Sequence, residues 1–238
     1  MSTPIAFLHA FPYGPAMWDE QVGLVSHRPL LVPDILGYES FEAAAAEVLL
    51  AMDQRGWDKA VLVGLSMGGY TLFRLWNLQP ERFAGMVLAD TRATPDTPES
   101  KAIRAQQATR IQREGMGFYP EVLLPSHLGQ TTREQRPELV ERVRKFQLEA
   151  DPHKTAHSLK ALANRPDSLP MLAEIDVPTL VLVGEEDTIT PLADARQMAQ
   201  GIPDSRMLIV PGAGHLSNLE NPKAFNTALL GFLAELEG

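Results

Sequence analysis

A serine set between glycines after a short apolar segment most constrains how this 238-residue chain can fold. The apolar run Ala60 to Val63 leads into the turn Gly64 to Gly69, and a helical pattern begins at Met67. A G-x-S-x-G turn between a strand and a helix strains the serine backbone and leaves no room for side chains at its glycines. The sequence therefore predicts that Ser66 presents its hydroxyl at the carboxyl end of a strand, beside a helix N-terminus.

Six short apolar segments predict the strands of one sheet. Most of them are continuous rather than alternating, which is typical of parallel strands covered by helices on both faces. In chain order they are Ile5 to His9, Leu30 to Pro33, Lys59 to Gly64, Gly85 to Ala89, Thr179 to Gly184 and Met207 to Val210. Because helical patterns separate the strands, we expect an open α/β sheet with right-handed crossovers.

Five helical patterns lie between or after these strands. They are Met17 to His27, Phe41 to Arg55, Met67 to Leu78, Pro191 to Gln200 and Pro222 to Leu236. Thr190 and Asn221 each precede a proline, which is the arrangement of a capping side chain followed by the first helical turn.

The alternation of strands and helices stops near Arg92 and resumes near Val177. Four helices are predicted between these points: Pro98 to Glu114, a short one near Phe118 to Leu124, Arg133 to Ala150, and Pro152 to Asn164. We therefore expect residues 92–165 to form a helical insertion, and residues 1–91 and 166–238 to form the α/β core.

The charge of the chain differs between these two parts. The formal net charge is −9, yet residues 91–170 hold 13 Lys and Arg against 10 Asp and Glu. The negative charge of the chain argues against nucleic acid and anionic membranes as partners. The apolar runs are too short to span a bilayer, and no secretory signal pattern opens the chain. We expect a cytoplasmic monomer or homodimer that acts on a small molecule.

A serine hydroxyl needs a base before it can act as a nucleophile. His215 lies in a glycine-rich loop after the last predicted strand, at the same sheet edge as Ser66, and is the predicted base. The other histidines outside the first loop lie in helical or polar contexts and are predicted to be solvated or structural: His27, His127, His153 and His157. The chain has no cysteine, and we expect no metal and no cofactor.

The base needs an acid that fixes its tautomer. Asp187 follows the strand Thr179 to Gly184 and is the predicted acid; the order Ser66, Asp187, His215 is that of one hydrolase fold. Asp90, at the end of another strand, is the alternative acid. Glu185 and Glu186, which are nearer to Asp187 in the same turn, are two further alternatives. The backbone N–H groups of Met67 and of Phe11, in the loop after the first strand, are predicted to hold the developing oxyanion.

These residues together resemble the α/β-hydrolase superfamily over essentially the whole chain. The resemblance rests on the His9 loop with Met17-Trp18, the Asp34 to Tyr38 turn, the Ser66 elbow, Ala89 to Arg92, the Asp187 turn and the His215 loop. It implies a mostly parallel sheet of about six strands, because the His9 loop comes too early for the N-terminal hairpin of the family. It also implies that residues 92–165 are a cap over the active site, inserted after the fourth strand.

Within that superfamily, Gly64 to Tyr70 and Leu88 to Arg92 are similar to 3-oxoadipate enol-lactonases and small bacterial carboxylesterases. The resemblance implies a serine hydrolase that cleaves a carboxylic ester or lactone through an acyl-enzyme. Two alternatives stay open: a cofactor-free perhydrolase or haloperoxidase on the same triad, and a hydrolase-like receptor with slow turnover. The predicted pocket residues are Trp18, Tyr38, Arg92, Phe118, Tyr119, Phe146 and Leu192, with Arg92 placed to hold an anionic substrate.

Overall fold

A computed structural model describes residues 2–237 and contains one six-stranded sheet. The strands are β1 (Ile5–Leu8), β2 (Leu30–Leu31), β3 (Ala60–Leu65), β4 (Phe83–Ala89), β5 (Thr179–Gly184) and β6 (Ser205–Val210). They follow the order β2-β1-β3-β4-β5-β6, and every neighbouring pair is parallel. The predicted fold class is confirmed, and the predicted strand ends differ from the observed ones by no more than two residues.

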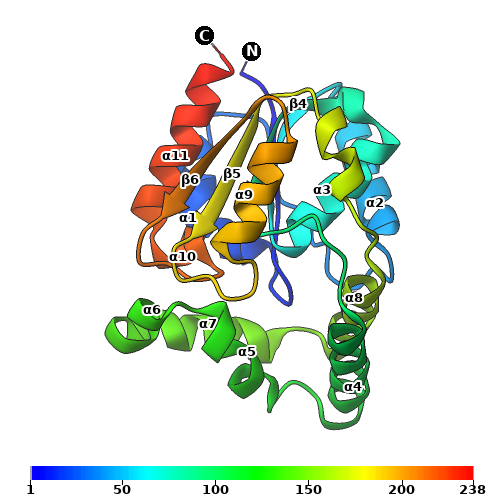
Figure 1. The fold of residues 1–238 in the computed structure, drawn as a ribbon, viewed down its shortest axis with the longest axis vertical. Helices are drawn as coiled ribbons and strands as arrows, with labels where there is room; N and C mark the ends of the chain where they lie inside the picture. The colour runs from blue at the N-terminus through cyan, green and yellow to red at the C-terminus, as the bar shows by residue number, and fades with distance from the viewer. Residues whose placement is uncertain (1, 238) are drawn as a thin grey trace.

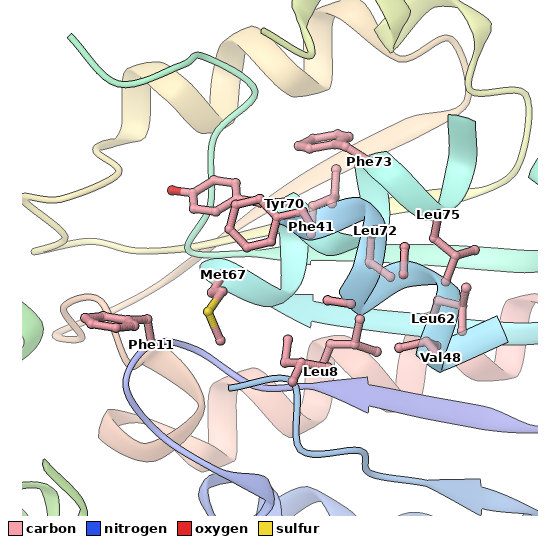
Figure 2. Packing of buried hydrophobic residues seen from close by; sticks show 14 of the residues in the cluster. Leu8, Phe11, Phe41, Val48, Leu62, Met67, Tyr70, Leu72, Phe73 and Leu75 are labelled. Carbon is pink, nitrogen blue, oxygen red and sulfur yellow. The ribbon is translucent and has the colours of Figure 1, made fainter. Parts of the chain in front are cut away.

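Helices cover both faces of the sheet (Figure 1). α2 (Phe41–Asp53), α3 (Met67–Leu78) and α9 (Leu192–Gly201) pack on one face, and α1 (Asp19–Val22) and α11 (Pro222–Glu235) pack on the other. Alternate residues of a strand point to opposite faces, so Leu62 packs with α2 and α3 while Val61 packs with α11. Figure 2 shows the first of these contacts, with Leu62 beside Val48 and Leu72.

Two predicted helix starts show how local signals compete with tertiary contacts. Asn221 caps α11 as predicted, since its side chain accepts from the Ala224 N–H and a proline follows it. Thr190 does not cap α9; Pro191 is the N-cap, and the Thr190 hydroxyl donates to Asp187 instead. The predicted helix Met17 to His27 is also wrong, because 3-10 turns at Pro15–Trp18 and Gly23–Val25 flank the single turn of α1.

Between β4 and β5 lie five helices at one end of the sheet (Figure 1). They are α4 (Pro98–Glu114), α5 (Tyr119–His127), α6 (Gln130–Gln135), α7 (Pro137–Glu149) and α8 (Pro152–Asn164). The predicted helix Arg133 to Ala150 is two helices, because the proline that begins α7 forces Arg136 out of the helical region. The remaining short elements are α10 (Ser217–Glu220) and 3-10 turns at Pro80–Arg82 and Leu169–Glu174. Within residues 2–237, the helices are all too short or too polar to cross a membrane.

Candidate active site

Ser66 occupies a strained turn between β3 and α3. Its backbone has φ 52° and ψ −108°, a conformation that L-residues rarely adopt. The turn is held by hydrogen bonds, since the Ser66 N–H donates to the Ala89 carbonyl at 2.9 Å and the Thr91 hydroxyl donates to the Ser66 carbonyl at 2.9 Å. A Cβ on Gly68 would lie 2.2 Å from the Leu8 carbonyl oxygen, so this position requires glycine.

Three loops bring Ser66, His215 and Asp187 into one hydrogen-bonded chain. His215 Nε2 lies 2.8 Å from Ser66 Oγ, and His215 Nδ1 lies 2.8 Å from Asp187 Oδ2. The three residues follow the carboxyl ends of β3, β6 and β5 respectively, and all three are buried. The geometry lets His215 accept the Ser66 proton while Asp187 holds its other nitrogen.

The charges of Asp187 and His215 stabilise each other inside the protein. Burial raises the pKa of Asp187, but the charge and hydrogen bond of His215 outweigh it and leave the pKa below its usual range. Burial lowers the pKa of His215, but the charge and hydrogen bond of Asp187 outweigh it and leave the pKa above its usual range. The site therefore favours an imidazolium once His215 has taken a proton.

Asp90, the alternative acid, has different partners. Its side chain is fully buried and accepts hydrogen bonds from the Gly184 N–H at 2.8 Å and from the Ser217 N–H at 3.1 Å. Burial, and then the nearby Asp187 carboxylate, raise the pKa of Asp90 to about 8. Asp90 thus joins the end of β5 to the start of α10, and its hydrogen bonds do not include His215.

The two nearer alternatives also have other partners. Glu185 accepts from the Gly212 N–H at 2.9 Å, and Glu186 accepts from the Thr131 N–H at 2.9 Å. The second of these bonds reaches across to α6, so Glu186 ties the inserted helices to the α/β core.

The two predicted oxyanion donors are the backbone N–H groups of Phe11 and Met67. Within residues 2–237, neither the Phe11 N–H nor the Met67 N–H donates to a protein acceptor. Figure 2 shows Phe11 in the loop after β1 and Met67 at the start of α3. His9 holds that loop, since its Nε2 accepts from the Ile35 N–H at 2.9 Å.

A cavity of about 590 Å³ opens onto Ser66 and His215. The α/β core contributes one part of its wall, and α4, α5 and α8 contribute the other. The lining from the core also includes Phe11, Tyr70, Thr188 and Ile189. The lining from the inserted helices is Ser100, Ile103, Arg104, Gln107, Tyr119, Leu123, Ser126, His127 and Leu162.

The inserted helices are fixed against the loops that carry Asp187 and His215. The Gly129 N–H donates to Glu220 Oε2 at 2.8 Å. A Cβ on Gly214 would lie 2.2 Å from Gly129 N, so the two backbones are in direct contact. At the other end of the insertion, Lys154 Nζ pairs with Asp34 at 2.8 Å.

Of the seven predicted pocket residues, only Tyr119 lines this cavity. Trp18 lies in the core against Phe7 and Phe225, with ring centroids 4.9 and 6.1 Å away. Tyr38 and Leu192 pack against the core on the α2 and α3 face. These three apolar side chains are therefore used for packing between the elements.

The two other aromatic candidates lie elsewhere on the inserted helices. The Phe118 ring faces the Arg110 guanidinium at 3.6 Å, and the Phe146 ring meets Tyr13 edge-on at 6.4 Å. Phe146 lines a separate hollow that also includes Asp34 and Lys154.

The predicted cation Arg92 does not line the cavity, but Arg104 does. Arg92 donates to the Ile189 carbonyl and pairs with Asp96 at 3.3 Å. Asp96, whose side chain is fully buried, also pairs with Arg104 at 2.5 Å and with Arg165 at 2.7 Å. Three arginines thus surround one carboxylate, and Arg104 is the one that reaches the cavity.

His127 is a cavity residue that the sequence did not identify. The sequence predicts that His127 is solvated or structural; it is not solvated, because it is buried in the last turn of α5, and it also lines the cavity. Its ring lies 5.6 Å from the His215 ring, centroid to centroid. His127 reaches the cavity because it comes just before Leu128-Gly129, where the insertion touches the His215 loop. Within residues 2–237, no group of three or more His, Cys, Asp or Glu side chains could hold a metal ion.

Comparison with known proteins gives a consistent result. The chain is 26% identical to 3-oxoadipate enol-lactonase 2 of Acinetobacter baylyi, over 90% of this chain and 82% of the relative. A solved thermophilic esterase from Thermogutta terrifontis superposes with a TM-score of 0.96 at 36% identity, covering 100% of this chain and 92% of the other. The enol-lactonase of Burkholderia xenovorans superposes with a TM-score of 0.90 at 27% identity, covering 98% of this chain and 92% of the other. The model of the "Alpha/beta hydrolase family" matches residues 5–228, and the chain therefore belongs to that family.

Proposed function

We propose that this protein hydrolyses carboxylic esters or lactones of small molecules through an acyl-enzyme on Ser66. The observation that carries the proposal is the chain of two 2.8 Å hydrogen bonds from Asp187 through His215 to Ser66, at the wall of a cavity. An esterase and two enol-lactonases are among the proteins that this chain resembles.

In the first half of the proposed reaction, Ser66 Oγ attacks the substrate carbonyl as its proton passes to His215 Nε2. The oxyanion that forms accepts hydrogen bonds from the Phe11 and Met67 N–H groups. His215 then gives its proton to the leaving alkoxide, and the acyl group stays on Ser66. In the second half, His215 takes a proton from water, the hydroxide attacks the acyl carbonyl, and the released Ser66 oxygen regains a proton.

Residues 92–165 act as the cap of this site in the proposal. They supply the side of the cavity opposite the α/β core. Among the lining residues, Arg104 is the one permanently charged side chain. Positive charge in a cavity favours anionic ligands. We therefore propose that esters with a carboxylate remote from the reacting carbonyl are preferred, with Arg104 rather than Arg92 as the recognising cation.

A panel of p-nitrophenyl esters and lactones tests the reaction, with the wild type and Ser66→Ala compared by kcat/KM. We expect the wild type to turn over repeatedly and Ser66→Ala to lose activity on every substrate. Activity retained in Ser66→Ala would overturn the proposal. A single burst without turnover would identify the receptor alternative, and peracid formation from a carboxylate and hydrogen peroxide would identify the perhydrolase alternative.

The charge preference is tested by the ratio of kcat/KM for p-nitrophenyl hydrogen succinate to that for p-nitrophenyl butyrate. Arg104→Gln is expected to lower this ratio about tenfold, the scale of a hydrogen bond to a charged group. Arg142→Gln is the matched control, because Arg142 pairs at the surface with Glu20 and does not line the cavity. Equal losses on both esters would overturn the preference.

A further inference from the structure

His127 and two buried partners form a hydrogen-bonded chain that the proposed reaction does not use. The Tyr13 hydroxyl lies 2.7 Å from His127 Nδ1, and Gln147 Nε2 donates to the Tyr13 oxygen at 2.8 Å. Tyr13 comes from the loop after β1, Gln147 from α7 and His127 from α5. All three side chains are buried, and of the three only His127 lines the cavity.

The direction of these hydrogen bonds fixes the proton on the imidazole. Because the Tyr13 oxygen already accepts from Gln147, its own proton is available for His127 Nδ1. In this orientation the Gln147 amide leaves its oxygen and one of its two N–H groups without a partner. The reverse orientation would leave both of its N–H groups without acceptors, and buried N–H groups without partners are rarer than under-satisfied carbonyls.

A neutral imidazole that accepts at Nδ1 carries its proton on Nε2. Burial, with a smaller contribution from the charge of His215, lowers the pKa of His127 to about 3. Burial also raises the pKa of Tyr13, so the hydroxyl keeps its proton. Within residues 2–237, no protein atom accepts a hydrogen bond from Nε2 of His127, whose ring lines the cavity.

We propose that His127 is a specificity-determining residue that donates its Nε2–H to a second oxygen of the substrate, one other than the carbonyl under attack. The ligand class is an ester or lactone with an ether, hydroxyl or carbonyl oxygen near the reacting centre. A neutral donor suits this position, because a charged imidazolium there would repel the imidazolium that forms on His215. The inference rests on the proposed hydrolase reaction.

The tautomer is tested without any substrate. Protein labelled with ¹⁵N-histidine and analysed by two-bond ¹H–¹⁵N correlation should show one neutral ring with protonated Nε2 and bare Nδ1 that stays neutral over the stable pH range. His127→Phe should remove that pattern, and Tyr13→Phe should shift it. A proton on Nδ1, or an imidazolium at neutral pH, would overturn the inference even if Ser66 is the nucleophile.

The contact with substrate is tested with isosteric pairs. p-Nitrophenyl methoxyacetate is compared with p-nitrophenyl butyrate, and 2-methoxyethyl acetate with butyl acetate, so that an ether oxygen is probed on each side of the ester. Intrinsic reactivity cancels when each variant is divided by the wild type. His127→Phe should lower kcat/KM about tenfold for the ether member of one pair while the alkyl member stays within about twofold, the difference made by one hydrogen bond.

His127→Gln is the conservative variant, because its amide N–H₂ lies near the position of the lost Nε2–H. It should restore part of the preference for the ether substrate, which a purely structural role of the ring would not require. If His127→Phe lowers both members of each pair equally, the proposed contact is absent. Failure of the proposed hydrolase function would be seen in a different experiment, as activity that is retained in Ser66→Ala.

Discussion

Replacement of Asp187 by asparagine moves the proton of the neutral His215 ring from Nδ1 to Nε2 without changing the number of heavy atoms in the side chain at position 187. Asp187 Oδ1 accepts from the Ile189 and Thr190 N–H groups at 2.8 and 3.0 Å, and Oδ2 accepts from His215 Nδ1. The two backbone donors cannot turn away, so the amide oxygen of Asn must take the Oδ1 position. The amide N–H₂ then faces His215 and makes Nδ1 the acceptor.

The consequence for catalysis follows from that tautomer. With Nδ1 bare, His215 carries its proton on Nε2 and cannot accept the proton of Ser66. A wrong tautomer of this kind lowers kcat by about 10⁴ in a Ser-His-Asp site, which corresponds to about 5 kcal/mol of transition-state stabilisation. The overall fold should be unchanged, because the two backbone hydrogen bonds to the side chain are retained.

Asp90→Asn is the matched comparison, since Asp90 is equally buried and lies beside the same loops. Its two oxygens accept from different backbone groups, the Gly184 and Ser217 N–H, so either amide orientation sets one N–H against the N–H₂. We expect about 1–3 kcal/mol of lost stability and a much smaller loss of activity. p-Nitrophenyl acetate hydrolysis and urea unfolding measure the two effects. The reasoning is refuted if Asp187→Asn keeps more than about a tenth of the activity, or if Asp90→Asn is the more damaging change.

Three further predictions concern stability, geometry and pH. Asp96→Ala leaves the Arg165 guanidinium, whose side chain is 2% exposed, without its carboxylate; we expect a loss of about 3–5 kcal/mol, or roughly 6–20 °C in Tm by thermal unfolding. Gly68→Ala places a Cβ 2.2 Å from the Leu8 carbonyl oxygen, so Ser66 shifts and kcat should fall about 100-fold or more. Because Asp187 holds the pKa of His215 above its usual value, kcat/KM should rise with pH through a midpoint above about 6.5 as His215 loses its proton.

Each of these has a result that contradicts it. For stability the control is Glu149→Ala, which removes only an exposed ion pair with Lys145 at 3.7 Å and should leave Tm unchanged. If Asp96→Ala also left Tm unchanged, the buried ion pairs of Asp96 would not stabilise the fold. Full activity in Gly68→Ala would mean that the elbow adapts without moving Ser66. A pH midpoint at or below the usual histidine value would mean that Asp187 does not stabilise the imidazolium.

The fold was predictable where local signals and packing agree. Continuous apolar strands and the Ser66 turn determine a parallel sheet, and Asn221, which precedes a proline, caps α11 as the sequence predicts. Prediction failed where a tertiary partner competes, as at Thr190, whose hydroxyl binds Asp187 rather than capping α9.

The candidate triad was predictable for a topological reason. Ser66, Asp187 and His215 each follow a parallel strand, and the carboxyl ends of such strands meet at one edge of the sheet. The pocket was not predictable in this way. Whether Arg92 or Arg104 reaches the cavity depends on the face that α4 presents, and the role of His127 depends on Tyr13, which lies 114 residues away in the chain.

Covalent labelling of Ser66 is the most direct test of the central claim. Phenylmethanesulfonyl fluoride sulfonylates a serine whose hydroxyl is activated by a neighbouring base. Peptide mass spectrometry should locate one adduct, on Ser66, in proportion to lost activity, and His215→Gln should make the labelling far slower. An adduct on another serine, or full labelling of Ser66 in His215→Gln at the wild-type rate, would contradict the account.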